Sequence, residues 1–267
     1  MLKYKNLEIK QIIKNYETQG VKTPLSGIFQ LRINENVEFE IITINNDDTS
    51  VVDRFWNRNH KDFVLEKWCE WSQDKGVYID IGAHTGIYTL SALKANPENR
   101  VIAFEPFVLN FHRIITNLRL NNYDNKSVSL FNAAVTNENK IIKFEVITPW
   151  SYLSKGGKIS NQGVDTKAIK LDSLKISKSN LKINAIKIDT EGEDLNVLLG
   201  AKNIISNHKP KIIVETRQNN VQEIISFLSD LGYNKIYDED NIKKTKINLM
   251  NFRDKQTTKD IFFEKID

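Results

Sequence analysis

The chain has 267 residues and is poor in cysteine: Cys69 is the only one. A single cysteine excludes an intrachain disulfide and suits a reducing compartment, so we expect a cytoplasmic protein. Cys69 itself is expected to be a buried apolar residue rather than a nucleophile. Histidine is also scarce, and His60, His84, His112 and His208 do not show the spacing of a metal site.

Long apolar segments are absent. The sequence has no run of about 18 apolar residues, so no membrane-spanning helix is expected. Residues 1–10 alternate charged and apolar side chains, which is not the pattern of a cleavable signal peptide. The formal net charge is +4, and the basic residues do not gather with aromatic residues into one compact run. A nucleic-acid-binding protein is therefore not expected.

A strand, glycine turn, helix and strand follow one another in the middle of the chain. Residues 77–81 are predicted as a buried strand, residues 87–95 as a helix and residues 101–104 as a second strand. Two parallel strands joined in this way bind ligands beyond their carboxyl ends. We therefore expect a ligand at the turn between residues 82 and 86.

The turn lacks two common nucleotide-binding fingerprints. A nicotinamide fingerprint needs G-x-G-x-x-G, but Ala83 separates Gly82 from the next residues and no second glycine follows until Gly86. A P-loop needs Gly-Lys-Ser/Thr, whereas Ile87 follows Gly86. The turn is therefore not built to neutralise a pyrophosphate.

Two acidic residues near the turn are not part of either fingerprint. Asp80 precedes Gly82 by two residues, and a carboxylate there suits a ligand that carries an ammonium or sulfonium group. Glu105 follows Gly86 by about 20 residues, the offset at which an acid binds a ribose 2′-hydroxyl in dinucleotide folds. A ribose-binding acid without a pyrophosphate turn indicates S-adenosylmethionine.

Three motifs in order carry a family resemblance. D-x-G-A-x-x-G at residues 80–86, A-F-E-P at residues 103–106 and I-K-I-D-T-E-G-E-D at residues 186–194 resemble the FkbM family of S-adenosylmethionine-dependent methyltransferases. The resemblance covers about residues 77–215. It implies a doubly wound α/β fold with a mostly parallel seven-stranded sheet, Rossmann-like as in class I methyltransferases. Family members typically methylate hydroxyls on sugars and secondary metabolites.

The resemblance also implies cofactor-binding residues. Those expected to hold the methionine part, the ribose and the adenine are, in chain order, Asp80, Gly82, Ala83, Gly86, Glu105, Pro106, Asn132 and Ala133, with Asp189 beside the methyl group. Two interpretations of Asn132 stay open, since it either hydrogen-bonds the adenine or closes a turn on its own backbone. His84 stands where the family more often has asparagine, and we interpret it as a turn residue rather than a base.

An acidic cluster is expected where the strands at residues 184–189 and 211–214 end. We select Asp189, Glu191 and Glu215 as candidate catalytic residues, because methyl transfer to a hydroxyl needs a proton acceptor. Neighbouring carboxylates could raise the pKa of a base, and they could also hold a divalent metal ion. Glu193 is interpreted as part of a capping box with Thr190, and Glu191 would then lie in the first helical turn.

The remaining chain is divided at residue 75. Residues 1–75 are predicted as an N-terminal α+β extension with a helix at 6–16, strands at 27–33 and 37–45, and a helix at 55–71. The tryptophans on that last helix are interpreted as packing on the sheet rather than stacking on a sugar. Residues 76–267 are predicted as the S-adenosylmethionine-binding domain.

Further elements are expected within the second part. Helices are predicted at 109–120, 190–199 and 221–231, and strands at 127–131, 140–147, 233–237 and 260–264. Residues 148–165 lack periodicity and are either a lid, with Trp150 and Tyr152 facing a sugar and Gly156-Gly157 as its hinge, or a surface insertion. Residues 238–259 are expected to form a polar excursion.

These observations predict an O-methyltransferase that acts on a hydroxyl of a small acceptor, most plausibly a sugar or glycan. Two other classes stay open: a protein that binds S-adenosylmethionine without catalysis, and a different nucleotide-dependent enzyme. Fold and cofactor site are shared across many chemistries, so the acceptor has to be argued from the site.

Overall fold

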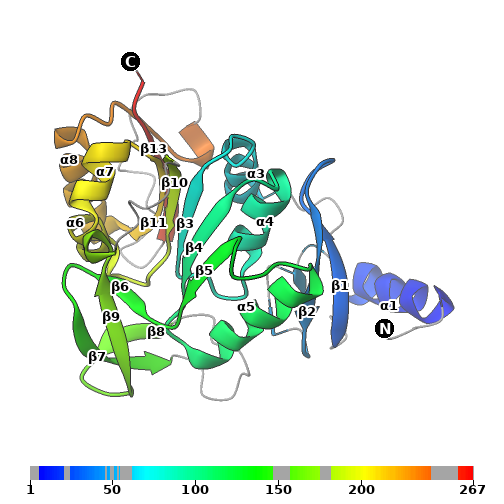
Figure 1. Ribbon diagram of the computed structural model, residues 1–267. Coiled ribbons are helices and arrows are strands. Elements are labelled where there is room, and N and C mark those ends of the chain that lie inside the picture. Colours follow the sequence, from blue (N-terminus) through cyan, green and yellow to red (C-terminus); the bar gives the residue numbers. More distant parts are fainter. Residues whose placement is uncertain are drawn as a thin grey trace.

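A computed structural model describes residues 6–20, 25–45, 47–48, 51–52, 54, 62–146, 157–174, 182–241 and 258–266. Its centre is a seven-stranded sheet formed by described residues (Figure 1). In spatial order the strands are β12 (Lys235–Tyr237), β13 (Thr258–Glu264), β11 (Lys211–Arg217), β10 (Ile183–Ile188), β3 (Val77–Ile81), β4 (Arg100–Phe104) and β5 (Val128–Phe131).

Most pairs in this sheet are parallel. β11, β10, β3, β4 and β5 run in one direction, whereas β13 is antiparallel to both β11 and β12. Strand β3 is buried along its whole length, as expected for a strand covered on both faces. The predicted mostly parallel seven-stranded α/β fold is therefore confirmed.

Helices cover both faces of the sheet (Figure 1). On one face lie α3 (Phe63–Trp71), α4 (Ile87–Ala95) and α5 (Val108–Leu120); on the other lie α6 (Asp194–Gly200), α7 (Lys202–His208) and α8 (Gln218–Asp230). Alternate side chains of β3 enter different core clusters, with Tyr78 on the α4 side and Ile79 on the α8 side. Trp68 and Trp71 are buried, which agrees with their interpretation as packing residues.

The N-terminal part forms a helix and a hairpin. They are α1 (Asn6–Gln19), β1 (Gly27–Arg32) and the antiparallel β2 (Glu38–Thr43), as predicted. The hairpin side chains Leu31, Phe39 and Ile41 belong to the same core cluster as residues of α3 and α4. The division of the chain at residue 75 stays a prediction. Residues 55–61 of the predicted helix lie outside the described residues.

A second, four-stranded sheet is inserted between β5 and β10. Its order is β6 (Ala134–Thr136), β9 (Val164–Lys170), β7 (Lys140–Val146) and β8 (Gly157–Ser160). The expectation that residues 148–165 lack regular structure is therefore wrong for β8 and the start of β9. Periodicity did not indicate β8, because it is short and begins with a glycine covered by the Phe144 ring of β7. Residues 147–156, including Trp150, Tyr152 and Gly156, lie outside the described residues.

Other elements also differ from expectation. Helix α6 begins at residue 194 rather than 190, and α7 was not predicted. Strand β11 continues through Glu215 to Arg217, because residues 212–217 pair with β13. Within residues 238–259, a 3₁₀ turn at Glu239–Asn241 and the start of β13 are described, and residues 242–257 lie outside the described part. No helix among the described residues is long and apolar enough to span a membrane.

Candidate active site

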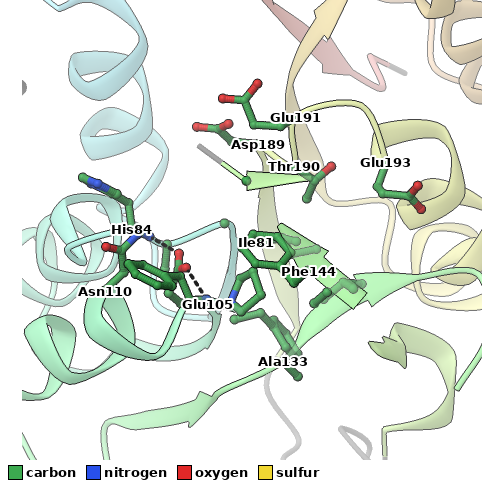
Figure 2. Close-up of a pocket in the computed structure, with 18 of the residues that line it drawn as sticks. Ile81, His84, Glu105, Asn110, Ala133, Phe144, Asp189, Thr190, Glu191 and Glu193 are labelled. Atoms are coloured by element: carbon green, nitrogen blue, oxygen red, sulfur yellow. Dashed lines mark hydrogen bonds between the residues drawn. The ribbon is translucent and has the colours of Figure 1, made fainter. Parts of the chain in front are cut away.

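A cavity of about 220 Å³ opens at the carboxyl ends of β3, β4, β5 and β10 (Figure 2). Seven of the predicted site residues line it: Gly82, Ala83, Glu105, Pro106, Ala133, Asp189 and Glu191. Figure 2 shows Glu105 and His84 on one side and Asp189 and Glu191 on the other. The predicted residues that do not line it are Asp80, Gly86, Asn132 and Glu215.

The first four residues of the turn at residues 82–86 line this cavity. Gly82, His84 and Gly86 all have positive φ values, of 79°, 52° and 87°. A Cβ atom on Gly82 would lie 1.8 Å from the backbone oxygen of Asp189, so the ends of β3 and β10 meet only because this residue is glycine. His84 occupies a left-handed turn position, where asparagine would also fit, as its interpretation as a turn residue requires.

Glu105 connects the turn to the end of β4. Its Oε2 accepts a hydrogen bond from the His84 amide and its Oε1 from the Phe107 amide, each at 2.8 Å. Its exposed fraction is 4%. Burial raises the pKa of Glu105 to about 8, although both amide donors act in the opposite direction. Each carboxylate oxygen can accept a further bond, so the group is suited to a pair of adjacent hydroxyls.

Asp80 is not among the residues that line the cavity. The residue is fully buried, and its Oδ2 accepts a hydrogen bond from Thr89 Oγ1 at 2.7 Å. Burial raises its pKa, and the nearby Lys187 ammonium opposes that rise. Its contact with a cationic ligand stays a prediction, and what the structure shows is that Asp80 raises the pKa of Lys187, which does line the cavity.

Lys187 is a site residue that sequence reasoning missed. Its Nζ lies 2.9 Å from Asp189 Oδ2 and 4.5 Å from the centroid of the Tyr88 ring. Burial alone would lower the pKa of Lys187, but Asp189 and Asp80 raise it, so the ammonium stays charged. A lysine inside an apolar strand, two residues before Asp189 and so on the same face of β10, was the available signal.

Asp189, directly after β10, and Glu215, within β11, form a carboxyl pair. Burial favours a raised pKa for Asp189, but Lys187 and hydrogen bonds from Glu215 and Lys187 lower it. The pKa of Glu215 is raised by burial and by the negative charge of Asp189. Two carboxyls in contact share a proton, and these shifts place it on Glu215. Asp189 is the ionised member, and its side chain is 35% exposed.

Glu191 belongs to a turn and not to a helix. Its φ is 55°, and its Oε2 accepts a hydrogen bond from Arg217 Nη2 at 3.0 Å. Burial and the charge of Asp189 raise its pKa, and Arg217 acts against them. The predicted stabilisation by the dipole of the first helical turn is therefore wrong, because α6 begins three residues later.

The predicted capping box is also wrong. Thr190 Oγ1 donates to Asp194 Oδ1 at 2.7 Å rather than capping the helix. Glu193 Oε2 instead accepts bonds from Thr136 Oγ1 at 3.0 Å and from Asn196 Nδ2 at 3.1 Å. The glycine at residue 192, with φ of 118°, lengthens the turn before the helix. Glu193 thus joins the inserted sheet to α6 at the cavity wall.

Asn132 does not line the cavity but bonds to the backbone next to it. Its Nδ2 donates to the backbone oxygens of Glu105 and Pro106 at 2.8 and 3.0 Å. This placement favours a backbone-closing role over the predicted adenine contact. The next residue, Ala133, lines the cavity as expected.

The described residues contain no group of three or more histidine, cysteine or acidic side chains placed to hold a metal ion. Within the acidic cluster, Lys187 pairs with Asp189 and Arg217 pairs with Glu191. The predicted divalent metal therefore has no support in the described part of the chain.

Comparisons with known proteins identify a fold and a family. No curated protein matches the chain. Among solved structures, methyltransferase FkbM from Methylobacillus flagellatus KT is similar with a TM-score of 0.50 and 16% identity. The match covers 79% of this chain and 52% of that one, so this chain spans about half the length of the Methylobacillus protein.

Two further solved structures have lower TM-scores. Precorrin-6y C5,15-methyltransferase from Geobacter metallireducens GS-15 has a TM-score of 0.44 and 14% identity, covering 77% of this chain and 89% of that one. A putative rRNA-methylase from Clostridium thermocellum has a TM-score of 0.46 and 10% identity, covering 78% and 98%.

The family comparison covers the cavity and the strands that carry it. The model of the methyltransferase FkbM domain matches residues 80–235, which is more than half of the chain. That range contains the glycine turn, Glu105, Asp189 and the inserted sheet. The chain therefore belongs to the FkbM methyltransferase family.

Proposed function

We propose that the protein is an S-adenosylmethionine-dependent O-methyltransferase for a small hydroxylated acceptor, most plausibly a sugar. The observation that carries this proposal is the placement of a buried carboxyl, Glu105, and an ionised one, Asp189, in the wall of one cavity. The first is suited to ribose hydroxyls and the second to an acceptor hydroxyl.

The lining residues fit this cofactor. The two ribose hydroxyls would find acceptors on Glu105, and the small apolar side chains of Ala133, Ala134 and Val135 leave room for a flat base. Asp189 is ionised, and Glu191 and Glu193 line the cavity beside it, which favours a ligand with ammonium and sulfonium charges. The cofactor would supply an electrophilic methyl carbon to an acceptor oxygen.

Asp189 would accept the proton that the acceptor hydroxyl releases. Its lowered pKa suffices, because the hydroxyl becomes more acidic as the bond from its oxygen to the methyl carbon forms, so the proton can move to Asp189 in the transition state. Lys187 holds the carboxylate in place through the 2.9 Å bond to Oδ2. Glu215 is then not the base proposed from the sequence but a proton-bearing neighbour that orients Asp189.

The charges at the cavity also bear on the acceptor. Lys187 is the one permanently cationic side chain among the described lining residues, and its ammonium is paired with Asp189. A phosphate-bearing acceptor such as a nucleic acid would find no unpaired cation among the described lining residues to bind its phosphates. A neutral polyhydroxyl acceptor fits this lining better.

The test is calorimetric titration with S-adenosylhomocysteine, with NAD and ATP titrated in parallel. We expect micromolar affinity for S-adenosylhomocysteine alone. Glu105→Ala should weaken that affinity by about 1–3 kcal/mol, the scale of hydrogen bonds to a charged group. Glu98→Ala, an exposed glutamate near the other end of β4, serves as the control. Absence of binding by the folded wild-type protein would overturn the cofactor assignment, and unchanged affinity in Glu105→Ala the ribose assignment.

A further inference from the structure

Thr85, inside the glycine turn, is held by residues from outside that turn. Its Oγ1 donates a short hydrogen bond to Asp48 Oδ2, and its backbone oxygen accepts one from Asn117 Nδ2 at 2.8 Å. Thr85 and Asp48 are 1% and 0% exposed. Because Thr85 also lines the cavity, the N-terminal part of the chain reaches the candidate cofactor site.

The turn needs such support because its backbone is unusual. The neighbours of Thr85, His84 and Gly86, have positive φ values, and few side chains favour that conformation. Within the turn one backbone bond is present, from the Gly86 amide to the Ala83 oxygen at 2.7 Å. The Gly82 and Ala83 amides bond to the Phe104 oxygen and the His84 amide to Glu105, which ties the first part of the turn to the end of β4. The bonds to the Thr85 hydroxyl and carbonyl hold its second part.

The residue before Asp48, Asp47, is held in a fixed position. Both carboxylate oxygens of Asp47 are bonded: Oδ2 to Arg113 Nη2 at 3.0 Å, and Oδ1 to Thr43 Oγ1 at 2.9 Å and the Ile44 amide at 2.8 Å. The side chains of Asp47 and Arg113 are 5% and 8% exposed. A buried, fully bonded carboxylate has little freedom, so the position of Asp48 is well defined.

Helix α5 holds the hairpin beside the turn. Arg113, Asn117 and Asn121 are four residues apart and so share one face of the helix. Asn117 and Asn121 accept bonds from the Ile42 and Glu40 amides, both at 3.0 Å, while Arg113 and Asn121 donate to the oxygens of Ile42 and Glu40. These side chains take the place of a third strand along the free edge of β2.

We propose that Asp48 and Thr85 are a positioning pair that holds the turn at residues 82–86 in its ligand-binding shape. The segment that follows the hairpin thereby completes the proposed cofactor site, although the family match begins only at residue 80. The identity of the ligand in this inference rests on the proposed function. The effect of the pair on the conformation of the turn does not depend on it.

The test compares Thr85→Val, which removes the hydroxyl at nearly constant volume, with Thr85→Ser, which keeps it. We expect about a tenfold loss of S-adenosylhomocysteine affinity in Thr85→Val, the scale of one charge-assisted hydrogen bond. Thr85→Ser should stay within about threefold of wild type because its hydroxyl can still donate. Thr116→Val, an exposed threonine on α5, is the control.

Amide hydrogen exchange at residues 83–85, measured without ligand, separates positioning from binding. Exchange should be faster in Thr85→Val and unchanged in Thr85→Ser and Thr116→Val. If wild-type protein does not bind S-adenosylhomocysteine, the proposed function fails while this comparison still decides the positioning role. Wild-type exchange and affinity in Thr85→Val would overturn the proposal, as would equal losses in the valine and serine variants.

Asp48→Asn supplies a second route that does not depend on the valine variant folding. It keeps the shape and an acceptor oxygen but loses the charge, so we expect about a threefold weaker affinity. In a Thr85→Val background the same change should add little, because the pair acts as a unit. No effect of Asp48→Asn on exchange or affinity, or full additivity of the two changes, would contradict the proposal.

Discussion

Glu105 makes cofactor binding depend on pH. Its pKa is raised to about 8 by burial, and the ribose hydroxyls would donate to its ionised form. A proton must therefore leave Glu105 on binding below that pH. We expect affinity for S-adenosylhomocysteine to rise by up to about tenfold per pH unit between about pH 6 and 8 and then level off.

Calorimetry in buffers of different ionisation enthalpy would show this proton release directly. Glu105→Gln cannot ionise, so its weaker binding should be flat across the same range. A pH-independent affinity in the wild type would show that Glu105 is already ionised without ligand.

Asp189 should matter for turnover more than for binding. Asp189→Asn keeps the size of the side chain but cannot accept the proton, and general-base catalysis is typically worth about 10²–10⁴ in rate. Affinity for S-adenosylhomocysteine should change by less than about threefold. Steady-state rates with an accepted sugar, beside calorimetry of the same variant, provide the measurement. Survival of activity would place the base elsewhere.

Glu215 should be replaceable by an amide. Because its carboxyl carries the proton shared with Asp189, Glu215→Gln supplies a donor of the same size, and we expect most turnover to remain. Glu215→Ala leaves Asp189 without that bond and should lose about tenfold. Equal damage in both variants would indicate that Glu215 acts in its ionised form.

At the scale of single residues, the sequence motifs identified some of the cavity residues and missed others. Glu105 and Asp189 could be selected because each follows a recognisable strand. Asp80 was selected for a ligand contact, and it is buried outside the cavity lining. Lys187 and Thr85 were missed, because their roles depend on partners that only the packing of distant segments brings near.

At the scale of elements, the close approach of β3 and β10 sets a strict demand on one position. A Cβ atom at Gly82 would collide with the backbone oxygen of Asp189, in addition to the strain of its positive φ. We expect Gly82→Ala to destabilise the protein by about 3–5 kcal/mol or to prevent folding.

Gly232→Ala is a matched control for this change. Gly232 has φ of 90°, and a methyl group added there would have no heavy atom within 4 Å, so only the backbone strain applies. Its cost should be about 1–2 kcal/mol in urea unfolding. Similar costs at both glycines would mean that the strand ends can move apart.

The elements that sequence predicted best are those with strong local signals. Strand β3 and helix α4 have the bounds expected from their apolar run and from Asn96-Pro97. Strand β8 was missed because it depends on pairing with β7, which periodicity does not encode. The late start of α6 was missed because a three-residue turn with two positive φ values precedes it, and periodicity does not encode that turn either. The long tail of β11 likewise depends on pairing with β13.

At the scale of the whole molecule, the hairpin of β1 and β2 is part of the hydrophobic core that α3 and α4 also form. Strand β2 contacts α4 and α5, and Leu31, Val37, Phe39 and Ile41 are buried within that core cluster. Burying each such side chain is worth about 1.5–3 kcal/mol, so together they approach the total stability of a typical domain.

A chain lacking residues 1–45 should therefore lose cooperative urea unfolding. A chain lacking residues 1–14 keeps Tyr16, which packs on Leu25 and Val52, and should unfold within about 2 kcal/mol of the full-length protein. A folded, cofactor-binding protein after the longer deletion would support independent folding of residues 76–267.

The side chains that α5 places along β2 also bear on self-association. An unpaired strand edge offers its amides and carbonyls to any extended segment of another molecule, which is a common start of aggregation. Here Arg113, Asn117 and Asn121 already occupy those groups at Glu40 and Ile42. The same three side chains that anchor the hairpin thus keep this edge from recruiting a strand of a neighbouring copy.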